Sequence, residues 1–261
     1  MAKLTIYDIK QAKGKRQLSQ VHVRSAEEAA AAEAAGVDIL CVYQHQTAEL
    51  RQAAPNTFIV AACGGGEASD TDAIKIAMAP MGAGADAVYT SISPNRIKAM
   101  ADERIPSISH VGFVPHRSSW YGGVRAVGKT PEEAMQIYRD TMAYQEAGAI
   151  GVEIEIVPHQ IATEISKRVD ISLISMGAGL GCDIQYLFAC DVLGLHDEHY
   201  PRHAKKYRNL KVDYDRIQQE RIAAFKEYSD EVHSGAFPEQ QHIVESKPEV
   251  LDEFVKMLES E

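Results

Sequence analysis

Residues 144–154 read Y-Q-E-A-G-A-I-G-V-E-I, a helical segment that ends at Ala147-Gly148 and passes directly into a short apolar strand. Glycine at a helix end accepts the left-handed conformation that closes the last turn. The same pattern, a helical segment followed by glycine and a short apolar strand, occurs around Gly36, in A-E-A-A-G-V-D-I-L-C-V, and around Gly84, in A-P-M-G-A-G-A-D-A-V. Strands that follow helices in this way run parallel, so the repetition predicts an α/β fold.

Short apolar segments, most of them separated by helical material, predict eight strands. They lie near residues 17–23, 38–43, 57–62, 86–91, 105–111, 150–156, 171–176 and 187–193. Eight parallel strands in this length of chain favour a (β/α)8 TIM barrel. A doubly wound open sheet usually has a glycine-rich phosphate turn after its first strand, and none follows Val23. The interval 180–186 leaves little room for a helix between the last two strands.

The domain organisation follows from length and composition. With 261 residues, 45% of them hydrophobic, the chain can bury a full core, and residues 1–261 are expected to form a single TIM barrel domain. The barrel itself is predicted over about 15–196. The pattern then becomes charged, which predicts a C-terminal lid and helical extension over about 197–261, with helices near 213–233 and 247–259.

Charge and cysteine usage narrow the class of partner. A net charge of -10 argues against nucleic acid and against an anionic membrane surface, because both select basic proteins, so a small-molecule partner is expected. No two of the four cysteines are spaced as a CxxC pair, which is typical of reduced thiols in the cytoplasm. No signal peptide is apparent, and no window approaches about 18 uninterrupted apolar residues, so we expect a soluble cytoplasmic protein.

The strand at 150–156 carries two glutamates. Because side chains alternate along a strand, Glu153 and Glu155 share one side, while Val152, Ile154 and Ile156 share the other. A strand covered by helices is normally apolar on both faces, so carboxylates here are costly unless they are paired or used in chemistry. The two glutamates therefore mark a candidate catalytic site.

The other candidates lie where the predicted strands end, because TIM barrels carry their catalytic groups at the carboxyl ends of strands. This set is rich in hydrogen-bonding groups and poor in charge. Besides the two glutamates it contains His22, Gln44, His45, Cys63, Tyr89, Ser91, His110 and Ser175 with the Gly177-Ala178-Gly179 turn.

Several segments together resemble one known family. They read H-V-G-F-V-P-H (110–116), G-G-V-R-A-V-G (122–128), E-I-E-I-V-P (153–158), M-G-A-G-L-G-C-D-I-Q (176–185), C-D-V-L-G-L (190–195), H-Y-P-R-H-A-K-K-Y (199–207) and V-H-S-G-A-F-P (232–238). Their order and spacing are similar to those of the ketopantoate (3-methyl-2-oxobutanoate) hydroxymethyltransferase family. That family belongs to the phosphoenolpyruvate- and pyruvate-binding TIM barrels. The resemblance is collinear over about residues 15–243.

The resemblance implies a magnesium-dependent enzyme that enolises ketoisovalerate, a small 2-oxo acid. It implies methylenetetrahydrofolate as the hydroxymethyl donor on the route to pantothenate. Glu155 matches the family's proton-transfer glutamate, and His110 matches a histidine that lines the site. Homo-oligomers are also implied by analogy with the family.

The family's metal ligands are replaced in this chain. Where the family has Gly-Asp-Ser, Ala-Asp-Leu-Pro-Phe and Lys-Ile-Glu-Gly-Gly after strands two, three and four, this chain reads Y-Q-H (43–45), A-A-C-G-G (61–65) and Y-T-S-I-S (89–93). Mg²⁺ prefers hard oxygen ligands that include one or two carboxylates. We therefore expect the magnesium site to be lost, and we predict no metal ligands.

Two replacements for the metal stay open. Gln44, His45, Tyr89 and Ser91 could donate hydrogen bonds to an enolate oxygen. Alternatively, His22, His45 and one of the two glutamates could bind zinc.

Other readings concern single residues. Glu153 could pair with His22 instead of working in catalysis. Cys63 is either a nucleophile or a small buried residue, and Gly64-Gly65-Gly66 either binds an anion or forms a flexible loop.

Three functions are therefore considered. The first is the family's hydroxymethyl transfer. The second is a diverged, metal-independent aldolase, lyase or hydrolase that acts on another carbonyl substrate. The third is a catalytically silent paralogue.

Overall fold

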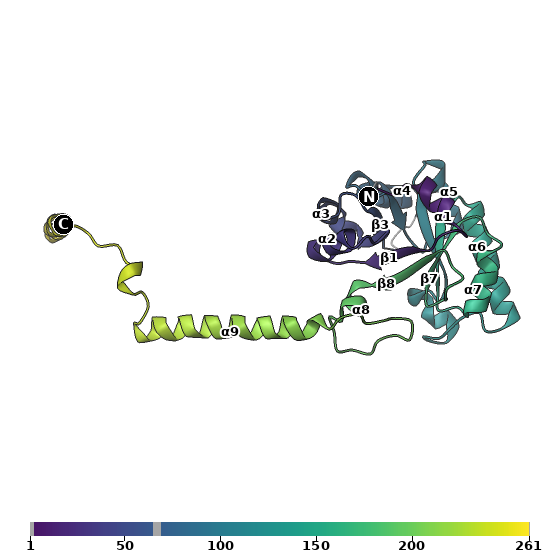
Figure 1. The fold of residues 1–261 in the computed structure, drawn as a ribbon. Coiled ribbons are helices and arrows are strands. Elements are labelled where there is room, and N and C mark those ends of the chain that lie inside the picture. The colour runs from purple at the N-terminus through teal and green to yellow at the C-terminus, as the bar shows by residue number, and fades with distance from the viewer. Residues whose placement is uncertain (1–2, 65–68, 261) are drawn as a thin grey trace. The chain divides into compact units, whose positions relative to one another are not determined.

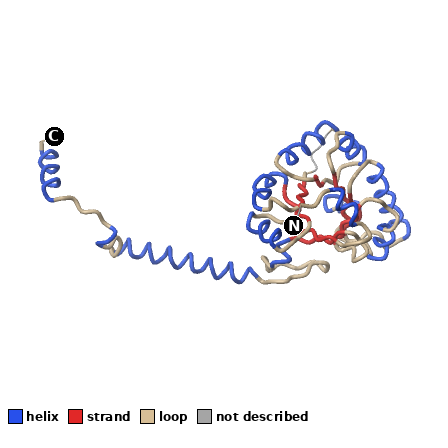
Figure 2. Tube along the Cα trace, turned by 45° about the horizontal axis from the view of Figure 1, so that its top comes forward, coloured by secondary structure: helices blue, strands red, loops and turns tan. Residues whose placement is uncertain are grey.

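The computed structural model describes residues 3–64 and 69–260, and its strands close into a barrel. Each strand pairs in parallel with the next, and β8 returns to β1. Figure 2 shows the strands as a ring inside a ring of helices. The strands are β1 (Leu18–His22), β2 (Ile39–Tyr43), β3 (Phe58–Ala62), β4 (Ala87–Tyr89), β5 (Ser107–Gly112), β6 (Gly151–Glu155), β7 (Ser172–Met176) and β8 (Ile184–Phe188). The predicted TIM barrel is confirmed.

Helices alternate with most of the strands and pack around them (Figure 1). Four of these helices begin at a hydroxyl side chain, which accepts a hydrogen bond from a first-turn backbone N–H; these residues are Thr5, Ser25, Ser69 and Thr130. The helices of this part of the chain are α1 (Ile6–Ala12), α2 (Ala26–Ala34), α3 (Thr47–Ala53), α4 (Asp70–Gly82), α5 (Pro94–Asp102), α6 (Pro131–Glu146), α7 (His159–Ser166) and α8 (Ala189–Leu193). Short 3-10 turns occupy Gln44–Gln46 and Pro115–Tyr121.

Strand alternation separates two apolar layers. Outward-facing residues such as Val152 and Ile154 pack in a cluster with residues of α5, α6 and α7. Inward-facing residues such as Ile39, Phe58 and Ile174 fill the barrel. Among the buried polar residues on the inward-facing positions are Gln20, His22, His110 and Glu153. The expected alternation around the two glutamates is therefore confirmed.

The position of the eighth strand differs from the prediction. Strand β8 covers Ile184–Phe188, whereas residues 189–193, which we had included in the strand, form helix α8. No helix lies between β7 and β8, because the described residues 177–183 form a connection too short for one. Apolar composition does not distinguish β8 from α8, because the buried side of a helix and a buried strand have similar composition.

The chain divides into two compact units, Met1–Arg208 and Asn209–Glu261. The second unit holds α9 (Leu210–Ser234), a short 3-10 turn at Gln240–His242, and α10 (Pro248–Glu259), near the predicted helix positions. Neither α9 nor α10 has a buried residue. Within residues 3–64 and 69–260, no helix has the length and apolar character needed to span a bilayer.

Candidate active site

Strands β4, β5 and β6 bring Tyr89, His110, Glu153 and Glu155 together. His110 lies opposite Glu153 in the β5–β6 register. Its Nε2 is 3.1 Å from Glu155 Oε2, and its Nδ1 is 2.7 Å from the Tyr89 hydroxyl. The Tyr89 hydroxyl also hydrogen bonds the Glu153 carboxyl. The four side chains therefore form one connected path from the barrel interior to Glu155.

Burial sets the protonation states along this path. Burial raises the pKa of Glu153 above its ordinary value, and the nearby Glu155 adds to this, whereas His110 and the Tyr89 hydroxyl act in the opposite direction. Burial alone would lower the pKa of His110, but the carboxyls of Glu153 and Glu155 raise it overall. Burial also raises the pKa of Tyr89, which keeps its hydroxyl protonated. The neighbouring carboxyls thus favour the protonated form of His110 within this path.

The backbone on both sides of Glu155 is tightly constrained. Ile156 has a positive φ of 48°, which is unusual for a β-branched residue and marks local strain. Its N–H donates to Met176 O at 2.8 Å and its carbonyl accepts from Val127 N at 3.1 Å. On the neighbouring strand, Gly112 lies opposite Glu155 with a φ of 80°. These contacts fix where the Glu155 carboxylate can lie.

His22 belongs to a different group of aromatic residues. Its Nδ1 is 3.4 Å from the Tyr186 hydroxyl, and its ring contacts those of Tyr43 and Phe188 at 4.7 and 5.0 Å between centroids. The suggested pairing of Glu153 with His22 is therefore wrong. Glu153 lies instead beside His110 and Tyr89, because its register on β6 points it toward β5.

Burial lowers the pKa of His22 to about 4, and the nearby Arg24 contributes in the same direction. Between pH 6.5 and about 4, His22 is therefore protonated in the unfolded chain but neutral in the folded protein. Stability should consequently fall as the pH falls through this window, by an amount on the order of 3 kcal/mol. Urea unfolding of the wild type and of His22→Gln at several pH values would measure it. The difference between the two proteins should be constant above pH 7, and a difference that stayed constant down to pH 4 would contradict the assignment.

The remaining predicted site residues lie at the same end of the barrel. Gln44 and His45 are exposed on the 3-10 turn after β2, where the His45 ring stacks on Tyr43 at 5.8 Å. Cys63 is half-buried after β3, with its Sγ 3.7 Å from Ala61 O. The Ser91 carbonyl accepts a hydrogen bond from Arg117 Nη2 at 2.6 Å. Gly65 and Gly66, considered for anion binding, lie outside the described residues.

Two interior residues were not among the sequence candidates. Cys41 faces His22 across the β1–β2 register, and burial raises the pKa of its thiol to about 12. Tyr186 on β8 hydrogen bonds Cys41 and approaches His22. Both sit at inward-facing positions that strand alternation could have identified, but Tyr186 required the correct limits of β8. These residues extend the buried polar group toward β1 and β8.

Magnesium does not suit this set of side chains. His110, Glu153 and Glu155 offer donor atoms within 4.8 Å of one another. However, Mg²⁺ prefers coordination by oxygen alone, whereas this group includes an imidazole, and the described residues that follow β2, β3 and β4, at 44–46, 63–64 and 90–93, contain no Asp or Glu. The suggested zinc site at His22, His45 and a glutamate is also wrong, because these residues do not form a metal-ligating group in the described part of the chain.

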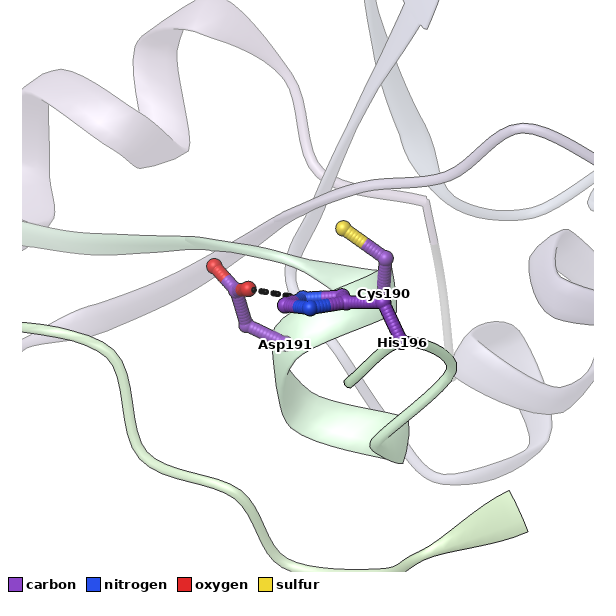
Figure 3. A group of neighbouring side chains, drawn as sticks. All are labelled: Cys190, Asp191 and His196. Carbon is purple, nitrogen blue, oxygen red and sulfur yellow. Dashed lines mark hydrogen bonds and ion pairs between the residues drawn. The ribbon is translucent and has the colours of Figure 1, made fainter. Parts of the chain in front are cut away.

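A second group of candidate donor atoms lies after β8, in α8 and the turn that follows it. Cys190, Asp191 and His196 place donor atoms within 4.8 Å of one another (Figure 3). His196 Nε2 is 2.9 Å from Asp191 Oδ1. The His196 ring stacks on Tyr200 at 4.4 Å, and the Tyr200 hydroxyl donates to the His196 carbonyl at 3.0 Å. This group anchors the start of the segment that follows α8.

Comparison with known proteins identifies the family and agrees with the barrel fold. Residues 42–240 match the sequence profile of the family described as ketopantoate hydroxymethyltransferase. The 3-methyl-2-oxobutanoate hydroxymethyltransferase of Thermus thermophilus is 32% identical over 264 residues, which cover 91% of this chain and 98% of that protein. 3-Methyl-2-oxobutanoate hydroxymethyltransferase 1 of Methylibium petroleiphilum is 38% identical over 163 residues, 62% of this chain and 53% of that protein. The chain thus spans about half the length of the latter relative.

Among solved structures, a similar fold occurs in 2,3-dimethylmalate lyase, a member of the PEP mutase/isocitrate lyase superfamily. The TM-score is 0.51 at 13% identity, and the match covers 98% of this chain and 96% of the lyase. At this level of identity the likeness concerns the barrel fold.

Proposed function

Because the chain belongs to the ketopantoate hydroxymethyltransferase family, we propose that it is an enzyme that enolises a small 2-oxo acid through Glu155 and makes or breaks a carbon–carbon bond. The observation that carries the proposal is the partly exposed Glu155 carboxylate at the carboxyl end of β6, whose Oε2 lies 3.1 Å from Nε2 of the buried His110 imidazole. Family membership favours hydroxymethyl transfer, for which methylenetetrahydrofolate would be the donor.

In this proposal Glu155 is the general base. Its carboxylate takes the proton from the carbon next to the carbonyl, and the electron pair of the broken C–H bond forms the enolate. The electrophile is formaldehyde, which hydrolysis of the methylenetetrahydrofolate donor releases together with tetrahydrofolate. The enolate carbon attacks the formaldehyde carbon and forms the new C–C bond, while the electron pair of the formaldehyde C=O bond moves to its oxygen, which takes up a proton from water. In the reverse direction, bond cleavage yields the enolate, and Glu155 returns the proton. His110 orients the carboxylate.

A negative oxygen develops as the enolate forms and must be stabilised. His110 in its imidazolium form places a positive charge beside Glu155, and Tyr89 holds the imidazole from its other nitrogen. Preorganised groups of this kind stabilise developing charge without a metal. Because the side chains do not suit Mg²⁺, the second candidate function is a metal-independent aldolase or lyase.

Proton exchange tests the proposal directly. The protein is incubated with ketoisovalerate in heavy water, with added magnesium or with a chelator, and the C3 proton is followed by NMR. We expect exchange that the chelator does not slow. Exchange that requires magnesium would contradict the metal-independent route. Absence of exchange with ketoisovalerate and with other 2-oxo acids would contradict enolisation itself.

A further inference from the structure

A cavity lies over the ends of β6, β7 and β8. It measures about 1060 Å³ and is lined by Ile156 and Val157, which directly follow Glu155, and by Ser175 and Tyr186. Binding sites for drug-sized ligands reach about 1,000 Å³. The cavity therefore has room for considerably more than a five-carbon acid.

The outer wall of this cavity, which we call the basic mouth, is rich in cationic and imidazole side chains. They are Arg125, Lys129, His159, His199, Arg202 and His203, and none of the described lining residues is Asp or Glu. Arg125 is already paired with Glu133. No ion pair joins Lys129 or Arg202 to a carboxylate within residues 3–64 and 69–260. Although the protein has a net charge of -10, the cationic side chains of this wall create a locally positive potential that attracts anions.

Two glycines make room for two of the imidazoles. A Cβ at Gly177 would lie 3.1 Å from the His203 ring, and one at Gly179 would lie 2.4 Å from the His159 Cβ. Both glycines have positive φ values, 73° and 87°. The turn after β7 thus lets His203 and His159 pack directly against its backbone at the cavity.

The segment that carries His199, Arg202 and His203 is held to the barrel at both ends. At its start, Asp191 binds His196, as described above. At its end, the Tyr207 N–H donates to the Val192 carbonyl at 2.9 Å. The backbone of this segment is therefore tied to α8 at both ends, which limits how far its cationic groups can move from the cavity.

We propose that the basic mouth binds a second anionic group of the substrate, a carboxylate or a phosphate distant from the reacting carbonyl. The inference rests on the proposed function, because it identifies the substrate class of that same site as dianionic 2-oxo acids. Lys129 and Arg202 supply the charge, and His159 and His203 supply N–H donors. The reacting end would lie beside Glu155.

The first test compares two substrates that differ by one carboxylate. We expect kcat/KM for C3 proton exchange to be at least about tenfold higher for 2-oxoglutarate than for 2-oxobutanoate, which corresponds to ~1.4 kcal/mol. The double variant Lys129→Gln/Arg202→Gln should reduce this ratio to near one. The matched control Lys205→Gln/Arg208→Gln removes two exposed charges that do not line the cavity and should preserve the ratio. Equal rates for the two acids in the wild type would overturn the inference.

A binding measurement separates this inference from the proposed function. Calorimetry with malonate and with inorganic phosphate is carried out on Glu155→Gln, which keeps the basic mouth but lacks the base. We expect at least one of the two anions to bind and the Lys129/Arg202 substitutions to weaken its binding at least tenfold. Binding of malonate alone would indicate that the second anionic group of the substrate is a carboxylate, and binding of phosphate alone would indicate a phosphate ester. If neither anion binds, the inference fails even where exchange is observed. Anion binding in a protein that shows no proton exchange would support the anion-binding role of the basic mouth and refute enolisation.

Discussion

Glu155→Gln should reduce C3 proton exchange at least about 100-fold, because an amide cannot accept the proton, and general base catalysis typically contributes ~10²–10⁴-fold. The Glu155 side chain is 14% exposed, and Gln is nearly isosteric with Glu. We therefore expect the fold to be retained. NMR exchange rates at saturating 2-oxo acid, together with thermal unfolding of both proteins, would measure the two effects separately.

Glu153→Gln is the matched control, since it makes the same chemical change two residues away on the same strand. Burial already favours the neutral form of Glu153, and a glutamine resembles that form. We expect exchange within about tenfold of the wild-type rate. A large loss in Glu153→Gln together with normal exchange in Glu155→Gln would reverse the roles that we assign to the two glutamates.

The barrel could be predicted from the sequence because its signals are local. Helix ends at Ala-Gly and the strand pattern of residues 150–156 depend on near neighbours in the chain. The eighth strand was misplaced because residues 184–193 are mostly apolar, and the boundary between β8 and α8 depends on pairing with β1. Local composition does not contain that long-range contact.

Candidate site residues could be found from the sequence, but not their partners. The ends of strands identified His22, His110 and Glu153, yet the partner of each depends on register across the barrel. The β5–β6 register brings His110 to Glu153, whereas His22 approaches Tyr186. The basic mouth was missed altogether, because Lys129, His159 and Arg202 come from separate segments that meet only in the folded chain.

Gly112→Ala should destabilise the protein by about 3 kcal/mol or more, because two costs add. The φ of Gly112 is 80°, a conformation that costs alanine ~1–2 kcal/mol. In addition, a Cβ at Gly112 would lie 2.5 Å from the Glu155 carbonyl oxygen and 2.7 Å from Val157 Cγ2. The first contact is with backbone, which cannot rotate away, so β6 must shift at Glu155. Chemical denaturation would measure the loss of stability, and proton exchange should slow as well.

Gly122→Ala separates the two costs. Gly122 has a similar φ of 72°, but a Cβ there would meet no atom within 4 Å. Its substitution should therefore cost only the conformational strain, ~1–2 kcal/mol, and leave exchange unchanged. The excess destabilisation of Gly112→Ala over Gly122→Ala measures how closely the β5 backbone packs against Glu155. Equal destabilisation by the two substitutions, with exchange unaffected in both, would mean that Gly112 does not help to position the base.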